Sequence, residues 1–444
     1  MTFSRILIAN RGEVAVRIIR TAAEMGIETV AIYSQDDAAS LHVTLADIAV
    51  PLEHPGAIAY LDGAGIIDIA KQHGCEAIHP GWGFLSENSE FARLCGEAGL
   101  TFIGPEPAAL ARLGDKAHAR LLAESCSVPI LAGINAAVSV EEAREFLRGR
   151  GPAGAIIIKA VAGGGGRGMR VVRTKEELGP AIVSAKREAK AAFGDDRMLI
   201  EKYVDNPRHI EVQIIGDSHG NLLSLFEREC TLQRRHQKVI EEAPSPTLNA
   251  RQREAVCEAA RKAAGAVDYV GAGTIEFVSD GKDVFFIEMN TRLQVEHPVT
   301  ELITGIDLVE WQLRVAFGEK LPLTQDQIRL NGHAIEARVY AEDPVTMYPS
   351  PGTITAYEEP AGDGVRIEGW VTDGTVVTPF YDPLLAKVVV WDETRDRAIQ
   401  KMRDTLARYR IEGIKTNISL LQKVLDHPGF VAGQYDVTLL SKPL

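Results

Sequence analysis

The sequence predicts a mixed fold, in which an α/β part with a parallel sheet precedes α+β parts with antiparallel strands. Residues 5–10 are typical of a strand, an amphipathic helix follows, and residues 28–33 are typical of a second strand, which together predict a βαβ unit. Strand-like runs at 155–160 and 169–173 flank a glycine-rich loop and predict a hairpin. After residue 330, short strands and Pro/Gly turns predict a smaller α+β or barrel-like part.

Composition and charge restrict the class of protein. The chain has 444 residues, enough for roughly three domains. Its formal net charge of −13 argues against non-specific binding to nucleic acid. The five cysteines are scattered without a C-x-x-C pair, which fits a reducing cytosol and predicts neither a disulfide framework nor a zinc site. The sequence shows no signal peptide and no apolar run of the ~18 residues that span a bilayer. We therefore expect a cytoplasmic protein with no membrane or nucleic-acid partner.

The stretch from Glu288 to His297 carries the densest set of reactive side chains. It follows an apolar, strand-like run, and on a strand Glu288 and Asn290 share one face. Glu276 lies in another strand-like run just before it. Two carboxylates and an amide on adjacent strands offer hard oxygen ligands, which suit Mg²⁺. The following residues add anion-binding and acid/base groups: Arg292, Gln294, Glu296 and His297. The alternative interpretation is a polar strand end with one or two salt bridges.

The glycine-rich loop at 161–168 predicts a phosphate-binding element. No helix opens after it, as a dinucleotide fingerprint requires, and the Lys-Ser/Thr end of a Walker A loop is missing. Glycine N–H groups can nevertheless close on phosphate oxygens, and Lys159 stands just before the loop. Lys116 opens a predicted helix behind the N-cap Asp115, where a phosphate would share the positive helix end. A mobile surface loop and a solvated lysine are the alternatives.

Other polar segments predict a cleft. Polar side chains share one face of two strand-like runs: His209, Glu211 and Gln213 in the first, and Glu336, Arg338 and Tyr340 in the second. For the first run, and for the basic run 228–238, a solvated face is the alternative to a ligand-binding role. The run 198–204 is typical of a strand whose end binds adenine through its backbone. The loop 79–88 around Trp82 fits either a shaped loop near a ligand or a tight turn with a core aromatic.

Together these segments resemble biotin carboxylase, the ATP-grasp subunit of biotin-dependent carboxylases. The resemblance spans essentially the whole chain and rests on residues 8–13, 79–81, 166–169, 233–238, 288–292, 294–297 and 381–387. It implies an N-terminal Rossmann-like domain over residues 1–115 and an ATP-grasp domain over 116–330, with a mobile glycine-rich lid over about 131–203. A C-terminal biotin carboxylase domain is expected over residues 331–444.

The resemblance also implies roles for individual residues. ATP is expected to contact Lys116, Lys159, Gly165, Gly166, Glu201, Lys202, Tyr203, Val204, His209, Gln233, His236, Glu276 and Glu288. Two Mg²⁺ or Mn²⁺ ions are expected on Glu276, Glu288 and Asn290. Bicarbonate is expected on Lys238, Arg292, Gln294 and Val295, and biotin on Trp82, Gly83 and Arg338. The catalytic residues implied are Glu296 as general base, Arg338 as stabiliser of the biotin enolate, Arg292 and Lys238.

The implied function is carboxylation of biotin with ATP and bicarbonate through carboxyphosphate, by default for acetyl-CoA carboxylase in fatty acid biosynthesis. No methionine here precedes a lysine, unlike the Met-Lys-Met turn of biotin carriers, so the biotin carboxyl carrier protein is expected on another chain. The carboxyltransferase is also expected on a separate chain, and the resemblance implies a homodimer. The family commonly has Tyr at Trp82 and Ser-Gly at residues 161–162, so biotin affinity and lid closure are expected to differ here.

Two other functions remain as alternatives. A different ATP-grasp carboxylate-amine ligase would share Lys116 and Glu288 but has no obvious need for Arg292, Glu296 and Arg338. A non-catalytic ATP-binding scaffold within a carboxylase complex is the second alternative. Free biotin would not stimulate ATP cleavage by either protein.

Overall fold

The computed structural model of the chain describes residues 2–135, 138–151, 154–162, 168–235 and 237–441. The N-terminal part is built on a parallel sheet with strand order β3-β2-β1-β4-β5. Its strands are β1 (Arg5–Ile8), β2 (Glu28–Tyr33), β3 (Ile48–Pro51), β4 (Ala77–His79) and β5 (Thr101–Phe102). The connecting helices are α1 (Gly12–Glu24), α2 (Leu41–Leu45), α3 (Gly63–Gln72), α4 (Ser89–Glu97) and α5 (Pro107–Gly114). The predicted βαβ unit is confirmed.

The loops after β1 and β4 meet at the carboxyl edge of this sheet, where ligands bind in open α/β sheets. The amide nitrogen Nδ2 of Asn10 donates to the carbonyl oxygens of Pro80, at 2.7 Å, and Trp82, at 2.8 Å. Gly81 lies between these residues at φ +62°, and an added Cβ would stand 2.9 Å from Asn10 Nδ2. The glycine therefore permits the close approach of the two loops.

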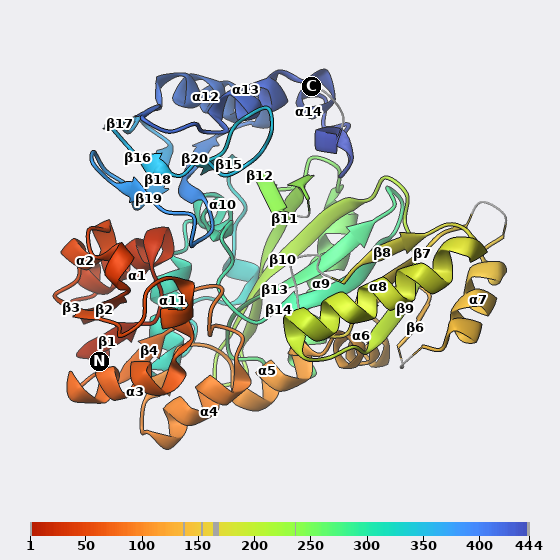
Figure 1. Cartoon of the computed structure of the whole chain (residues 1–444), viewed down its shortest axis with the longest axis horizontal. Coiled ribbons are helices and arrows are strands. Elements are labelled where there is room, and N and C mark those ends of the chain that lie inside the picture. The colour runs from red at the N-terminus through yellow and green to blue at the C-terminus, as the bar shows by residue number, and fades with distance from the viewer. Residues whose placement is uncertain (1, 136–137, 152–153, 163–167, 236, 442–444) are drawn as a thin grey trace.

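An eight-stranded antiparallel sheet forms the centre of the molecule (Figure 1). Its order is β14-β13-β10-β11-β12-β15-β20-β18. The strands are β10 (Arg208–Gly216), β11 (Leu222–Arg234), β12 (Gln237–Ala243), β13 (Gly271–Ser279), β14 (Val284–Asn290), β15 (His333–Tyr340), β18 (Val365–Gly369) and β20 (Leu384–Asp392). The C-terminal strands β15, β20 and β18 extend this sheet across the β12–β15 pairing, so the smaller α+β or barrel-like part expected after residue 330 shares its largest sheet with the preceding part.

A smaller antiparallel sheet, β6-β9-β7-β8, lies to one side of the central sheet (Figure 1). It consists of β6 (Gly133–Ile134), β7 (Ile156–Ala160), β8 (Arg170–Val172) and β9 (Met198–Lys202), with α7 (Val140–Gly149) and α8 (Lys175–Phe193) beside it. Strands β7 and β8 pair antiparallel, which confirms the predicted hairpin. Its apolar side chains form a separate core, in which Ile156, Ile158 and Ile200 are buried.

The remaining helices cover the central sheet and the C-terminal part. They are α6 (Lys116–Ser125), α9 (Ala250–Gly265), α10 (His297–Thr304), α11 (Leu308–Ala316), α12 (Arg395–Arg408), α13 (Ile418–Asp426) and α14 (Pro428–Val431). Two short ribbons pair β16 (Gly352–Thr353) with β19 (Val376–Val377), and β17 (Ala356–Glu358) with β21 (Arg410–Glu412). The helix predicted to start at Lys116 is present, and Asp115 caps it by accepting from the His118 N–H at 3.0 Å. Among the described residues, no helix is long and apolar enough to cross a membrane.

Candidate active site

A cavity of about 910 Å³ lies between the central sheet and the smaller sheet. Most of the residues predicted to bind ligands line it: Trp82, Gly83, Lys116, Lys159, Glu201, Tyr203, His209, Gln233, Lys238, Glu276, Glu288, Asn290, Arg292, Gln294, Val295, Glu296 and Arg338. Lys202 and Val204, at the end of β9, are not among the described lining residues. Gly165, Gly166 and His236 lie outside the described part of the chain.

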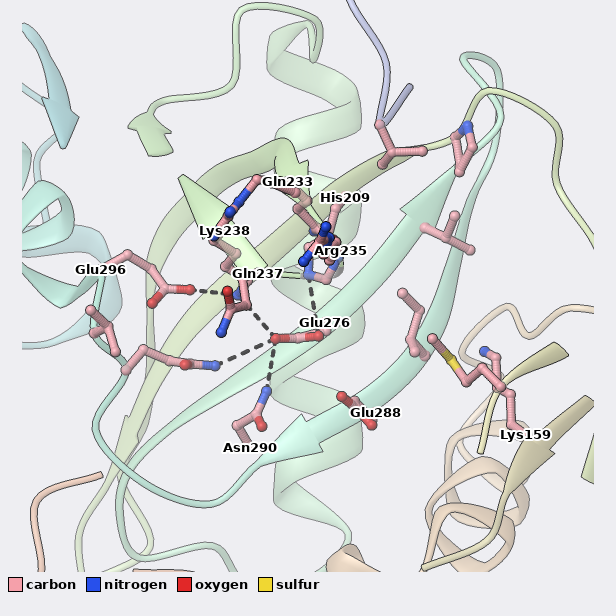
Figure 2. A pocket seen from close by; sticks show the side chains of 18 of the residues that line it. Lys159, His209, Gln233, Arg235, Gln237, Lys238, Glu276, Glu288, Asn290 and Glu296 are labelled. Atoms are coloured by element: carbon pink, nitrogen blue, oxygen red, sulfur yellow. Dashed lines mark hydrogen bonds and ion pairs between the residues drawn. The ribbon is translucent and has the colours of Figure 1, made fainter. Parts of the chain in front are cut away.

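Three carboxylates form a row across neighbouring strands. Strand register places Glu211 on β10 directly opposite Glu276 on β13, and Glu276 opposite Glu288 on β14. Asn290 joins them by donating from Nδ2 to Glu276 Oε1 at 2.8 Å (Figure 2). Like charges in direct cross-strand register repel each other. This row therefore requires cations beside it.

Basic side chains lie beside these carboxylates. The Lys116 ammonium contacts Glu288, and His209 Nε2 lies 3.2 Å from Glu276 Oε2. Lys238 bridges three carboxylates: its Nζ is 2.5 Å from Glu211, 3.1 Å from Glu276 and 2.5 Å from Glu296. Burial alone would lower the pKa of Lys238, but these three carboxylates outweigh burial and raise it well above 10.5. Lys238 is therefore an ammonium ion at neutral pH.

Glu296 lies between two cations at the start of α10. Its Oε1 accepts from Lys238 and its Oε2 accepts from Arg338 Nη2 at 2.9 Å. Burial would raise the pKa of Glu296, but Lys238, Arg338 and the fully buried Arg228 together lower it well below 4.5. Glu296 is thus ionised at neutral pH, so it can accept a proton. Figure 2 shows Glu296 and Lys238 directed towards each other at one end of the cavity.

Arg292 and Gln294 stand beside Glu276 in the loop after β14. Arg292 Nη1 donates to Gln294 Oε1 at 3.1 Å, and its Nε lies 3.2 Å from Glu87 Oε2. Glu87 also accepts from the Thr291 N–H at 3.2 Å, so it fixes the loop at both its backbone and its guanidinium. Glu87 belongs to the 79–88 segment, but sequence reasoning assigned it no role. Its partner lies far along the chain, and the local pattern carries no signal of that contact.

The opposite wall of the cavity is provided by the smaller sheet and α6. Lys159 on β7 pairs with Glu201 on β9, which also pairs with the buried Arg120 (Figure 2 shows Lys159). Burial and the nearby charge of Lys159 lower the pKa of Lys116 to about 8. Two neighbouring lysines facing a row of carboxylates suit a ligand that is both polyanionic and metal-bound, such as a nucleoside triphosphate.

The polar face of β10 is buried, so its solvated alternative is wrong. Arg228 on β11 is fully buried and donates from Nε to Glu211 at 2.5 Å and from Nη1 to Gln213 at 2.6 Å. The same guanidinium reaches Thr300 at 2.9 Å and Thr274 at 3.1 Å. Within the basic run, Arg228 thus holds the polar side chains of β10 in place and is itself buried. Glu211 was visible in the predicted polar face, but its contact with Lys238 depends on strand register.

Trp82 is half-buried and connects the cavity to a second group of residues that sequence reasoning missed. Its indole N–H donates to Glu13 Oε1 at 3.0 Å, and Glu13 Oε2 lies 2.9 Å from Lys387 Nζ. Lys387 donates in turn to the carbonyl oxygen of Val295 at 3.0 Å. Glu13 and Lys387 occur in the two segments that begin and end the resemblance, but nothing in their local pattern predicts their pairing.

Acidic strands that face Lys159 of the smaller sheet and Lys116 of α6 are typical of an ATP-dependent enzyme. Residues 115–324 match the family model for the ATP-binding domain of the carbamoyl-phosphate synthase L chain. Residues 2–110 match the N-terminal domain of biotin carboxylase, and residues 336–442 match its C-terminal domain.

Similar proteins specify the family further. A biotin carboxylase of Halalkalibacterium halodurans is 52% identical over 100% of this chain and 98% of its own length. The methylcrotonoyl-CoA carboxylase subunit alpha of Mus musculus is 50% identical over 97% of this chain, and this chain spans 61% of its length. A solved structure that resembles this chain is the biotin carboxylase domain dimer of Hydrogenobacter thermophilus 2-oxoglutarate carboxylase, in complex with MgADP, ADP and bicarbonate. Its TM-score to this chain is 0.97 at 45% sequence identity, and the match covers 99% of this chain and 98% of the other.

The chain belongs to the biotin carboxylase family. Its three-part architecture, predicted as Rossmann-like, ATP-grasp and C-terminal biotin carboxylase domains, is confirmed. It is a biotin carboxylase, which is an ATP-dependent ligase, so the alternatives of a carboxylate-amine ligase and of a non-catalytic scaffold are set aside.

Proposed function

We propose that the chain carboxylates the biotin of a carrier protein with ATP and bicarbonate, and that the residues around Glu296 carry the reaction. The observation that carries this assignment is the position of Glu296 between Lys238, at 2.5 Å, and Arg338, at 2.9 Å, in the cavity that also holds the carboxylate row. A carboxylate between two cations can receive the proton of an anionic substrate that competes for the same cations.

ATP is assigned to the wall formed by the smaller sheet and α6, which carry Lys159 and Lys116. Lys116 and Lys159 bind phosphate oxygens, the segment Glu201–Val204 binds adenine, and His209 and Gln233 complete the contact with the nucleotide. Gly165, Gly166 and His236 are proposed to contact ATP on the basis of the family resemblance alone. Support comes from Lys116 and Lys159, two neighbouring cations that line one cavity with Tyr203.

Glu276, Glu288 and Asn290 would hold two Mg²⁺ or Mn²⁺ ions. Their oxygen atoms are the hard ligands that these ions prefer, and the register pairing of Glu276 with Glu288 brings two carboxylates to one point of the sheet. When bound, such ions neutralise the phosphate charge that develops during phosphoryl transfer. The two carboxylates and the amide therefore fit these ions.

Bicarbonate is assigned to Lys238, Arg292, Gln294 and the Val295 backbone. Its arrival weakens the hold of Lys238 on Glu296, because the anion shares the ammonium, and the pKa of Glu296 rises from its depressed value. Glu296 then takes the bicarbonate proton as the bicarbonate oxygen forms a bond to the γ-phosphorus and the bond to ADP breaks. The products are carboxyphosphate and ADP.

Carboxyphosphate breaks its C–O bond to give CO₂ and phosphate, and the phosphate accepts the N1′ proton of biotin. Biotin N1′ then bonds to CO₂, while Arg338 stabilises the negative ureido oxygen, as an oxyanion-binding group does. Trp82 and Gly83 contact the biotin rings at the same end of the cavity. Closure of the 131–203 lid over the nucleotide excludes water from carboxyphosphate.

We propose domain boundaries at residues 115 and 330, supported by family matches that end and begin near these positions. A homodimer is supported by the dimer of the Hydrogenobacter relative. Carrier and carboxyltransferase on separate chains are supported by the Halalkalibacterium biotin carboxylase, of which this chain spans 98%.

We propose acetyl-CoA as the acceptor of the complete complex and the cytoplasm as its location. Methylcrotonoyl-CoA is the second acceptor to assay, because the Mus musculus relative is 50% identical.

The test is ADP release by purified protein with Mg²⁺, ATP and bicarbonate, with and without free biotin. Stimulation that requires both bicarbonate and biotin supports the proposal. A rate indifferent to both substrates contradicts it. The acceptor is tested separately, by adding a biotinylated carrier and a carboxyltransferase and comparing incorporation of labelled bicarbonate into acetyl-CoA and methylcrotonoyl-CoA.

A further inference from the structure

Arg338 is held by two carboxylates on opposite sides. Its Nη2 donates to Glu296 at 2.9 Å on the cavity side, and its Nε lies 2.6 Å from Glu241 Oε1. Glu241 belongs to β12 and is fully buried. It is not among the described residues that line the cavity, whereas Glu296 and Arg338 are. Glu241 therefore reaches the substrate site through Arg338.

The sheet around Arg338 has an unusual charge pattern. Strand register places Glu241 directly opposite Glu336 across β12 and β15, and Arg338 directly opposite Lys387 across β15 and β20. Two glutamates thus face each other in one pair and two basic residues in the other, and the ion pair that Glu241 makes is the diagonal one with Arg338. Glu241, Glu336 and Lys387 are fully buried, and Arg338 is 8% exposed.

Burying a carboxylate in this way costs stability. A buried ion pair commonly contributes no more than apolar residues of the same volume would, so its presence beside a reacting group is better explained by what it positions. Glu241 contacts the guanidinium at Nε and leaves Nη2 to Glu296, so the two carboxylates hold Arg338 at different nitrogen atoms.

The reaction changes the charge on only one of these two carboxylates. In the sequence of steps proposed above, Glu296 takes the bicarbonate proton before biotin reacts, and a protonated Glu296 no longer attracts Arg338 as an ion. Arg338 would then lose its cavity-side partner at the step in which it must stabilise the biotin ureido oxygen. Glu241 lies behind Arg338, away from bicarbonate, and keeps its position throughout.

We propose that Glu241 is a positioning residue, which holds the Arg338 guanidinium in place for biotin while Glu296 carries the proton of bicarbonate. This inference rests on the role proposed above for Arg338. Glu241 is required for the biotin-dependent half of the reaction and dispensable for the cleavage of ATP by bicarbonate alone, because Arg338 acts on biotin.

The test compares Glu241→Gln with Glu242→Gln in the full-length protein. Glu242 is the next residue on the same strand and is equally buried, but its partners are His333, Arg395 and Tyr435. Both variants replace one buried carboxyl group of β12 by an amide, so a general loss of stability affects both. Thermal unfolding establishes the temperature at which each is folded. ADP release is then measured at that temperature with saturating ATP and bicarbonate, with and without free biotin.

We expect Glu241→Gln to lower kcat/KM for biotin about tenfold or more, and to change the biotin-independent, bicarbonate-dependent rate by less than about twofold. Glu242→Gln should change both rates per folded molecule by less than about twofold. Equal losses of both rates in Glu241→Gln, or a biotin-dependent rate equal to that of the unmodified protein, would overturn the proposal.

Two further variants complete the test. If Glu241→Gln does not fold, Glu241→Asp keeps the carboxyl group but withdraws it from Nε. The loss of activity in this variant should again be confined to the biotin-dependent rate. An equal loss of both rates overturns the proposal there too. Arg338→Gln separates the two proposals. If it leaves the biotin-dependent rate unchanged, the role of Arg338 fails, whereas a loss in Arg338→Gln without one in Glu241→Gln refutes only the positioning role of Glu241.

Discussion

The indole N–H of Trp82 donates to the buried carboxylate of Glu13 at 3.0 Å. Through Lys387, the same carboxylate is connected to the carbonyl oxygen of Val295, the residue before Glu296. An N-terminal loop, the loop that carries Glu296 and a C-terminal strand are thereby connected through one buried ion pair. The nitrogen of Trp82 is engaged with Glu13, so its face and edge are what remain for a ligand in the cavity.

Replacement of Trp82 by Phe should affect both stability and biotin. Glu13 is 3% exposed, and the loss of a hydrogen-bond donor to a buried acceptor costs about 1–3 kcal/mol. We expect a lower melting temperature and a higher KM for biotin with an unchanged KM for ATP. Trp391→Phe is the matched control, because Trp391 also donates its indole N–H, to the Asn331 carbonyl, but does not line the cavity. Equal changes in both KM values would argue against a biotin contact.

Glu296→Gln should abolish bicarbonate-dependent ATP cleavage and leave MgATP binding nearly intact. The amide has the size of the carboxylate but cannot accept the proton, and loss of a general base typically costs 10²–10⁴-fold in rate. Stopped-flow or steady-state ADP release measures the first effect, and calorimetric titration with a non-hydrolysable ATP analogue measures the second. Appreciable turnover in this variant would remove Glu296 from the role of base.

Glu288→Gln should weaken the binding of the metal ions specifically. Removing one of the two carboxylates proposed as metal ligands should raise the Mg²⁺ concentration for half-maximal rate about tenfold or more at fixed ATP. Asp283→Asn is the control, because Asp283 is exposed at the other end of the same hairpin. A lower maximal rate at an unaltered Mg²⁺ requirement would indicate that Glu288 acts through Lys116 instead.

Glu336→Gln should stabilise the protein at alkaline pH. Burial raises the pKa of Glu336 well above 4.5, Lys387 opposes the rise and Glu241 adds to it. The folded chain therefore keeps a proton that the unfolded chain releases near pH 4.5, and its stability falls by up to about 1.4 kcal/mol per pH unit above that point. Glutamine removes this penalty.

We therefore expect the melting temperature of Glu336→Gln to exceed that of the unmodified protein near pH 8 and to match it near pH 5. Thermal unfolding across this range measures the difference. A difference in melting temperature between the two proteins that is constant with pH would show that Glu336 is ionised in the folded chain. A gap that widens towards pH 5 would contradict the assigned direction of the shift.

Local periodicity was sufficient to predict the elements and one face of the site. Strand β2 spans the predicted residues 28–33, and α6 begins at the predicted Lys116. The spacing of Glu288 and Asn290 on one strand, with Glu276 on another, predicted that they would meet, and the register of β13 and β14 brings them together. These features depend on the two-residue period of a strand, which a sequence displays directly.

Periodicity does not show which charged residues, distant in the sequence, pair with each other in the fold. Glu87, Glu211, Glu241 and Lys387 all hold a site residue in place, and each was overlooked or left without a role, because its partner lies on another strand or in another part of the chain. A buried polar face and a solvated polar face have the same alternation along a strand. For β10, the contact of Glu211 with the fully buried Arg228 shows that the polar face is buried. This contact exists only after β11 has paired with β10.

The central sheet passes without interruption from β14 to β18, so the match boundaries along the chain are not places at which it can be cut. A chain ending near residue 330 would leave β12 with an unpaired edge, and exposed edges of this kind invite aggregation. Chimaeras between relatives would accordingly need to exchange residues 208–392 as one block. Any domain added to this chain would accordingly have to lie outside the sheet, whose eight strands depend on one another for pairing.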